Sequence, residues 1–130
     1  MNTVDVLIIV DVEGALATNL TDNVYLVDTN KHVGSGSEGQ AELRTAIKDG
    51  QLLTWNVVSV APSNDVEISG FTGQMIADKI CVPQMVTAPG SVYWEGRVEA
   101  QGFTGTQQYS VNLTMDGKQE SFDPFLVIGA

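Results

Sequence analysis

The side chains that could carry out covalent catalysis are scarce in this sequence. Its 130 residues include one histidine, His32, and one cysteine, Cys81. A Ser-His-Asp or Cys-His centre would have to use His32, which lies in a glycine- and serine-rich stretch that would hold a catalytic geometry poorly. The sequence has no Gly-x-Ser-x-Gly motif and no phosphate-binding Walker lysine. We therefore expect a protein that is not an enzyme, and a small paired-carboxylate hydrolase ranks only as a third alternative.

The lone cysteine is predicted to be structural. Cys81 lies between Ile80 and Val82 and is followed by Pro83, so its surroundings are apolar. With one Cys and one His, the chain offers too few ligands for a zinc site. We expect Cys81 to be a small core residue.

Oxygen ligands for a hard cation are plentiful, since 16 residues are Asp or Glu. Two clusters are close together in sequence, Asp11 with Glu13 and Asp22 with Asn23. No EF-hand loop is present, but carboxylate and amide oxygens are the ligands that Ca²⁺ prefers. Calcium is therefore the one cofactor that the sequence suggests, and the alternative is that these are solvated turn residues.

Two tryptophans are candidates for a carbohydrate platform. A sugar site needs an aromatic face for the apolar side of the ring and a few polar groups for the hydroxyls. Trp55 and Trp94 both lie in segments of alternating polarity, so the competing interpretation is that they are core residues. Trp94, which lies beside Tyr93 and Glu95, is the better candidate.

The elements that must position these side chains are predicted to be β-strands. Apolar and polar residues alternate with a period of two, and no long segment has the 3.6-residue period of a helix. About eight strands separated by turn signals are typical of a sandwich or a barrel. We predict an all-β fold, an antiparallel and jelly-roll-like β-sandwich, formed by residues 1–130 as one domain. The predicted strands are Val4–Val12, Val24–Asp28, Val66–Phe71, Ser91–Gln101, Gln107–Met115 and Phe122–Ile128, together with a hairpin over Leu43–Val60.

Two features of the sequence make this prediction more specific. The segment Val4–Val12 is so rich in Val and Ile that we expect it to be buried on both faces. Asp49-Gly50 and Asp116-Gly117 are the hairpin turn signals.

Charge and composition limit the partners. The net charge is −10, which disfavours nucleic acid and anionic membranes. No basic leader and no apolar run near the roughly 20 residues of a spanning helix is present. We expect cytoplasmic synthesis without membrane insertion, which is compatible with later release.

Three segments resemble a known family. They are similar to motifs of the AidA/PixA family of bacterial inclusion-body proteins. The three segments are Val4–Glu13 (VDVLIIVDVE), the strand around Leu53-Thr54-Trp55, and the ending Phe122–Ile128 (FDPFLVI). The chain departs from the family pattern at Gln51, usually aspartate, and at Phe122, usually tryptophan. The resemblance implies a β-sandwich and, in some members, accumulation as inclusions; sugar binding has been proposed for some.

A geometric hypothesis joins the two ends of the chain. If the first and last strands pair antiparallel, Asp11 lies near Asp123. Two carboxylates there would repel unless Ca²⁺ or sugar hydroxyls lay between them. The alternative is that Asp123 caps the turn before Pro124.

Two functions remain in competition. The first is a non-enzymatic protein that binds glycans or simple sugars of the galactose or fucose type through Trp94, Asp123, Asp11 and Glu13, with metal ligands among Asp11, Asp123, Asp22 and Asn23. Because a millimolar site supplies only about −4 kcal/mol, such a protein would need several sites in a homodimer or homotetramer. The second is an inclusion-body, storage or structural protein whose function is self-association without a small-molecule ligand.

Overall fold

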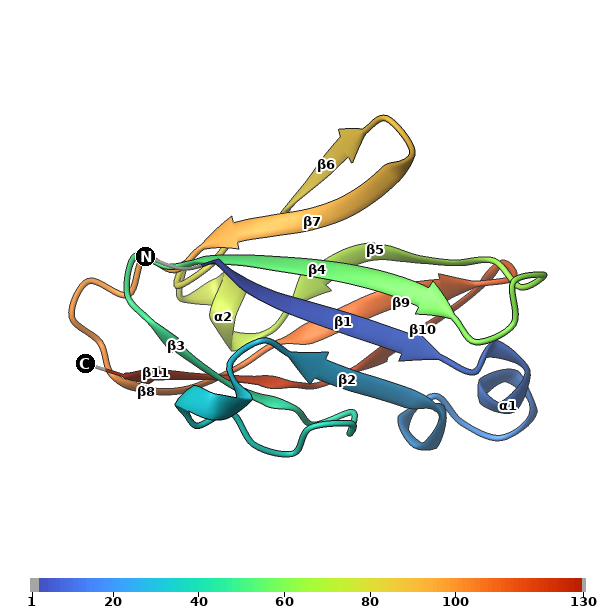
Figure 1. Ribbon diagram of the computed structural model, residues 1–130, viewed down its shortest axis with the longest axis horizontal. Coiled ribbons are helices and arrows are strands. Elements are labelled where there is room, and N and C mark those ends of the chain that lie inside the picture. The colour runs from blue at the N-terminus through green and yellow to red at the C-terminus, as the bar shows by residue number, and fades with distance from the viewer. Residues whose placement is uncertain (1–2, 130) are drawn as a thin grey trace.

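A computed structural model of the protein describes residues 3–129. The predicted all-β sandwich is confirmed (Figure 1), with eleven strands in three sheets over this part of the chain. The first sheet has the order β2 (Val24–Asp28), β1 (Val4–Val10), β4 (Leu52–Ser59), β7 (Ser91–Arg97) and β6 (Gln84–Ala88). The second has the order β10 (Lys118–Phe122), β9 (Ser110–Met115) and β5 (Val66–Thr72), and the third β3 (Arg44–Lys48), β11 (Phe125–Gly129) and β8 (Gly105–Gln108).

The helices are short. They are α1 (Val12–Ala17), α2 (Gln74–Ala77) and the 3₁₀ turns η1 (Thr21–Asn23) and η2 (Lys31–Val33). Within residues 3–129, no helix has the length and apolar character needed to cross a bilayer.

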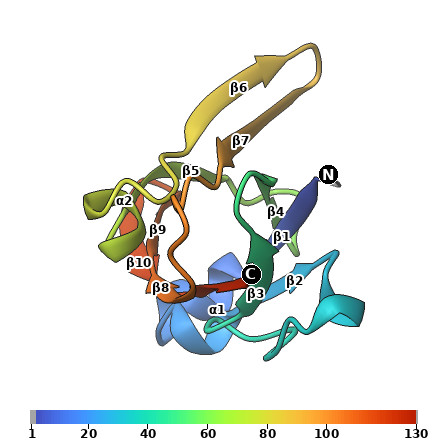
Figure 2. The same cartoon turned by 90° about the vertical axis from the view of Figure 1, so that its left-hand side faces the viewer.

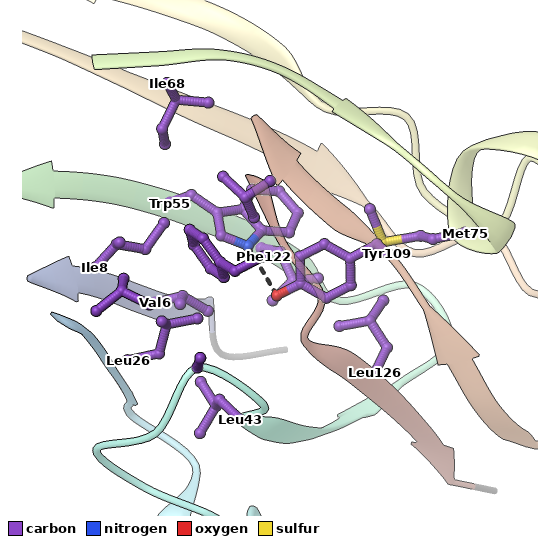
Figure 3. Close-up of a cluster of buried hydrophobic side chains, with 14 of the residues drawn as sticks. Val6, Ile8, Leu26, Leu43, Trp55, Ile68, Met75, Tyr109, Phe122 and Leu126 are labelled. Carbon is purple, nitrogen blue, oxygen red and sulfur yellow. Dashed lines mark hydrogen bonds between the residues drawn. The ribbon is translucent and has the colours of Figure 1, made fainter. Parts of the chain in front are cut away.

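The core lies between the sheets, where strands such as β1, β9 and β11 contribute alternate side chains. In β1 these are Val4, Val6, Ile8 and Val10, all buried. Figure 3 shows Val6 and Ile8 facing a cluster that includes Trp55, Tyr109 and Phe122. Removing such side chains from water is the main stabilising term of the fold.

The three additional strands have two sources: the sequence pattern does not predict β6, and two predicted strands are each divided in two. The predicted strand Gln107–Met115 is interrupted at Tyr109, and the predicted strand Phe122–Ile128 is interrupted before Phe125. Both breaks occur at one place, because the Tyr109 amide donates to the Pro124 carbonyl at 3.1 Å. One long two-stranded ribbon therefore bends there, so that β9 and β10 belong to one sheet and β8 and β11 to another.

Two predicted pairings are wrong. Leu43–Val60 contains two strands and a turn at Gly50, but β3 pairs in parallel with β11 and β4 pairs in parallel with β1. The chain passes from one sheet to another at this turn, so no hairpin forms there, and the sandwich is not purely antiparallel. The proposed pairing of the first and last strands also fails, because β1 lies between β2 and β4. The turn at Asp116-Gly117, by contrast, does connect an antiparallel hairpin, β9–β10.

One buried hydrogen bond joins two elements of the core. Trp55 Nε1–H donates to the Tyr109 hydroxyl at 3.2 Å, and both side chains are fully buried. We predict that Tyr109→Phe lowers the free energy of unfolding by about 1–3 kcal/mol, because the indole N–H loses its acceptor. Urea denaturation measures this change. The control is Tyr25→Phe, at an exposed ring, which should stay within about 0.5 kcal/mol of the native protein; equal stability of the two variants would contradict the assignment.

Candidate functional site

A cleft opens where one hairpin leaves the body of the sandwich. The strands β6 and β7 form a hairpin that projects from the molecule in both views (Figures 1 and 2). Here its residues Gln84–Trp94 are called the arm. Between the arm and strands β4 and β5 lies a cleft of about 450 Å³. Its lining consists of Val57, Val66, Glu67, Ile68, Ser69, Met85, Val92 and Trp94.

The arm projects because the β4–β7 ladder is short. The two strands pair only from Leu52 with Arg97 to Trp55 with Trp94. Beyond Trp55, β4 continues alongside β1 as far as Ser59, while β7 diverges. The edge of β4 over residues 56–59 that faces the cleft therefore has no partner among the described strands. An open edge of this kind is a template for pairing with another strand.

The base of the arm is packed tightly. A Cβ atom added to Gly96 would lie 2.6 Å from Cys81 Sγ and 3.3 Å from Pro83 Cα. Only glycine lets β7 approach the segment before β6 this closely. Cys81 itself is buried, as predicted, and burial, helped by the charge of Glu99, raises the pKa of its thiol to about 12.

The arm carries exposed apolar side chains and no charge. None of its eleven residues, Gln84–Trp94, is Asp, Glu, Lys, Arg or His. Met85 and Val92 are each 56% exposed. In a chain of net charge −10, this is an unusually neutral projection.

A second apolar surface covers the outside of the first sheet. Ile9 lies opposite Tyr25 on β2 and Val58 on β4, and Leu7 lies opposite Val27. Residues directly opposite in a sheet point to the same side, and this side faces outwards, because Tyr25 and Val58 are 43% and 45% exposed. Val60, at 61%, continues the row. The outer patch is defined as Leu7, Ile9, Tyr25, Val27, Val58 and Val60.

The opposite sheet shows what an ordinary outer face looks like. The outward residues of β9 and β10 are Ser110, Asn112, Thr114, Gln119 and Ser121. An antiparallel sheet with one solvated face alternates in this way. The prediction that the first strand is buried on both faces is wrong, since Leu7 and Ile9 are only partly covered. Its continuous apolar run nevertheless signalled the outer patch.

Three of the predicted metal ligands lie at one end of β1, where they fix the chain. Asp11 Oδ1 accepts from the Gly14 amide at 3.1 Å and caps α1. Asp22 Oδ2 accepts from Asn19 Nδ2 at 3.0 Å, and Asn23 Nδ2 donates to the Asn19 carbonyl at 2.8 Å. Glu13 is exposed in the first turn of α1.

The fourth ligand, Asp123, lies on another sheet's connection. It is exposed and accepts from Ser110 Oγ at 2.6 Å, at the bend between β10 and β11. Because β1 and β11 do not pair, the reason for bringing Asp11 and Asp123 together is lost. Over residues 3–129, no group of three or more His, Cys, Asp or Glu side chains is arranged to hold a metal ion.

The two tryptophans have different environments. Trp55 is a core residue, and Trp94 is partly exposed on the cleft wall. Phe71 lies between them, with ring centroids 4.8 Å from Trp55 and 5.4 Å from Trp94. An aromatic row therefore runs from the core to the cleft. His32 is exposed on η2.

Sequence comparison places the chain in a family. The family DUF8788, described as a domain of unknown function, matches residues 2–121. The chain belongs to this family. No curated protein matches this DUF8788 member.

Structure comparison relates the fold to that of an inclusion body protein, PixA, from Burkholderia cenocepacia. The TM-score is 0.73 at 13% sequence identity, and the likeness covers 98% of this chain and 96% of that chain. The resemblance seen in the sequence is thus confirmed at the level of the fold.

The base of the arm gives a testable constraint. We predict that Gly96→Ala destabilises the protein by about 1–3 kcal/mol, because the added methyl overpacks against Cys81. Gly36→Ala is the control, since a Cβ there has no neighbour within 4 Å. In a double-mutant cycle measured by urea denaturation, Cys81→Ala should relieve part of the cost of Gly96→Ala. Strictly additive effects would refute the contact.

The neighbouring carboxylates of Glu38 and Asp28 make the stability of the fold depend on pH. Burial raises the pKa of Glu38; a hydrogen bond from the Asp28 amide opposes the rise and the charge of Asp28 adds to it. A raised pKa in the folded state means that the protonated form is favoured there. Protonated Glu38 contributes to stability below its ordinary, unfolded-state pKa of about 4.3, and this contribution is lost as the pH rises through its higher pKa in the folded state.

Glu38→Gln should remove this loss. We expect the variant to equal the native protein near pH 4 and to become progressively more stable than it as the pH rises to 7, in urea denaturation at a series of pH values. Glu42→Gln, at an exposed carboxylate, is the matched control. A constant difference across the pH range would count against the assignment.

Proposed function

We propose that this protein is a structural protein whose function is to associate with copies of itself, in the manner of an inclusion-body protein, and that it needs no small-molecule ligand to do so. The observation that carries the proposal is the outer patch. Six apolar side chains lie together on the outside of β2, β1 and the end of β4, at positions where a solvated sheet would carry polar ones, and Asn56, opposite Leu7, is a polar residue on the same face. Contiguous exposed apolar surface of this kind marks an interaction site.

A second copy of the same patch is the partner that fits it. The three strands present a sheet face, and sheets pack face to face at about 10 Å with interdigitated apolar side chains. A two-fold contact would place Ile9 and Val58 of one copy against the same residues of the other. Such a contact buries apolar groups on both sides and brings no carboxylate of the patch into the interface.

Charge favours this choice. With 16 acidic and 6 basic residues, two copies repel over most orientations. The outer patch itself contains no charged residue, so a patch-to-patch contact is the one in which repulsion is lowest. A basic partner, by contrast, would be attracted to the acidic remainder of the surface.

The structural neighbour is consistent with this proposal. PixA from Burkholderia cenocepacia is described as an inclusion body protein. Inclusion bodies are dense protein deposits, which require contacts between copies. The same fold with an exposed apolar sheet face is what such a role needs.

Carbohydrate binding is a second candidate. The observation in its favour is that Trp94, partly exposed, lines the cleft together with Glu67 and Ser69. Calorimetry with galactose and fucose, with and without calcium and with Trp94→Ala, tests it. Binding heat that is seen with the native protein and lost in the variant would support sugar binding. No binding heat with the native protein would refute it.

The self-association proposal makes a direct prediction. We expect the native protein to sediment as species larger than a monomer, increasingly so with concentration, in analytical ultracentrifugation. Val58→Glu should shift the distribution towards smaller species, because it places a charge in the patch. Gln119→Glu makes the same charge change on the polar outer face of β10 and should leave association unchanged. A native protein that stays monomeric at every concentration would refute the function.

A further inference from the structure

We propose that two copies of this chain exchange their arms, so that the arm of each copy lies in the cleft of the other. This deepens the self-association proposed above and rests on it. It assigns the cleft to a second copy of the same chain.

The apolar side chains of the arm match the cleft. The cross-strand pairs Met85 with Trp94 and Thr87 with Val92 place Met85, Val92 and Trp94 on one face of the hairpin. That face lines the cleft, yet Met85 and Val92 are each 56% exposed. The wall itself is apolar, with Val57, Val66 and Ile68. A second arm inserted there would cover both surfaces.

The backbone of β4 over residues 56–59 can also form a β-ladder on the side where β7 has diverged. The register that pairs Trp55 with Trp94 would, if continued, pair Asn56 with Tyr93 and Val57 with Val92. The chain's own arm diverges before making these pairs. An extended strand from a second copy can make the same ladder along residues 56–59 of β4, which is how exposed sheet edges take up a foreign strand.

The charges indicate a copy of this chain rather than an unrelated peptide. The arm is neutral, and Glu67 is the acidic residue among those that line the cleft. A basic peptide would find more negative charge elsewhere on a surface of net charge −10. An acidic segment would be repelled by the chain as a whole. The arm of a second copy is both neutral and apolar on the required face.

Arm exchange changes what self-association can build. A single two-fold contact closes on itself and stops at a dimer. The outer patch uses the outward side chains of β2, β1 and β4, whereas arm exchange uses the cleft and the open backbone edge of β4, so the two contacts involve different faces of the sheet. A chain with two independent two-fold contacts can link dimers into an extended assembly.

Cross-linking tests the exchange directly. Ser69→Cys and Val92→Cys introduce exposed thiols on the cleft wall and on the arm. The two single variants, carrying tags of different mass, are mixed and oxidised, and Cys81 can stay because it is buried. We expect disulfide-linked pairs that contain one chain of each variant. If the double variant instead closes a disulfide within one chain and the mixed singles form none, the arm folds onto its own cleft and the proposal is overturned.

Sedimentation separates this proposal from the one on which it rests. Val92→Glu should leave dimers as the main species and lower the fraction of protein in species larger than a dimer at least tenfold. The double variant Val92→Glu/Val58→Glu should be monomeric. Gln84→Glu, on the other face of the arm, is the matched control and should behave as the native protein. If Val92→Glu associates as Gln84→Glu does, arm exchange fails while self-association stands. A monomeric native protein overturns both.

Discussion

Trp55 and Tyr109 make a buried contact between sheets, in which the indole N–H donates to the hydroxyl at 3.2 Å. Trp55 lies on β4, and Tyr109 lies at the bend between β8 and β9, so their hydrogen bond links the first sheet to the place where the other two sheets separate. Phe71 on β5 packs on both rings, at 4.8 Å from Trp55 and 6.3 Å from Tyr109. Large aromatic side chains contribute most to a core when they are fully removed from water.

The same cluster explains where the cleft begins. Trp55 pairs with Trp94 at the last step of the β4–β7 ladder, and Phe71 packs against both. Beyond this point β7 has no aromatic contact to hold it to β4, and Val92 and Met85 face open space. Within the β4–β7 ladder, two residues after Trp94, Gly96 lets the base of the arm come into close contact with Cys81 and Pro83. The arm is therefore held firmly at its base and by Trp94, and its remaining residues project.

The sequence predicts the architecture better than the connections. Period-two alternation identifies the sandwich, and Asp116-Gly117 identifies a hairpin whose turn and pairing both hold. Alternation cannot tell which strands become neighbours, because an inward-facing row looks the same in any sheet. Asp49-Gly50 between two alternating segments therefore predicts a hairpin of β3 and β4, although each pairs in parallel with another strand. The bend at Tyr109 and Pro124 also leaves no signal, since both halves of each strand keep the alternation.

The candidate site is only partly predictable, for a related reason. Trp94 can be singled out by its type and neighbours, and it does line the cleft. The cleft itself depends on where one ladder ends, which is a property of packing between segments distant in sequence. Asp11 and Asp123 are joined only by an assumed strand pairing, and once that pairing fails each is explained by a local hydrogen bond. The outer patch has a sequence signal, the apolar run Val6–Val10 of β1. The same run is expected for a strand buried inside one chain and for a strand covered by another copy.

Charge gives these apolar surfaces their specificity. A chain with exposed Val, Ile and Tyr on a sheet and a projecting arm would aggregate without order if its surface were otherwise neutral. The ten excess negative charges counter this, because most encounters bring carboxylates together. Only contacts between uncharged surfaces escape that repulsion, and the outer patch and the arm are two such surfaces. In the proposed assembly, the acidic composition, which by itself suggests only solubility, would restrict association to a few orientations and so favour an ordered assembly over a precipitate.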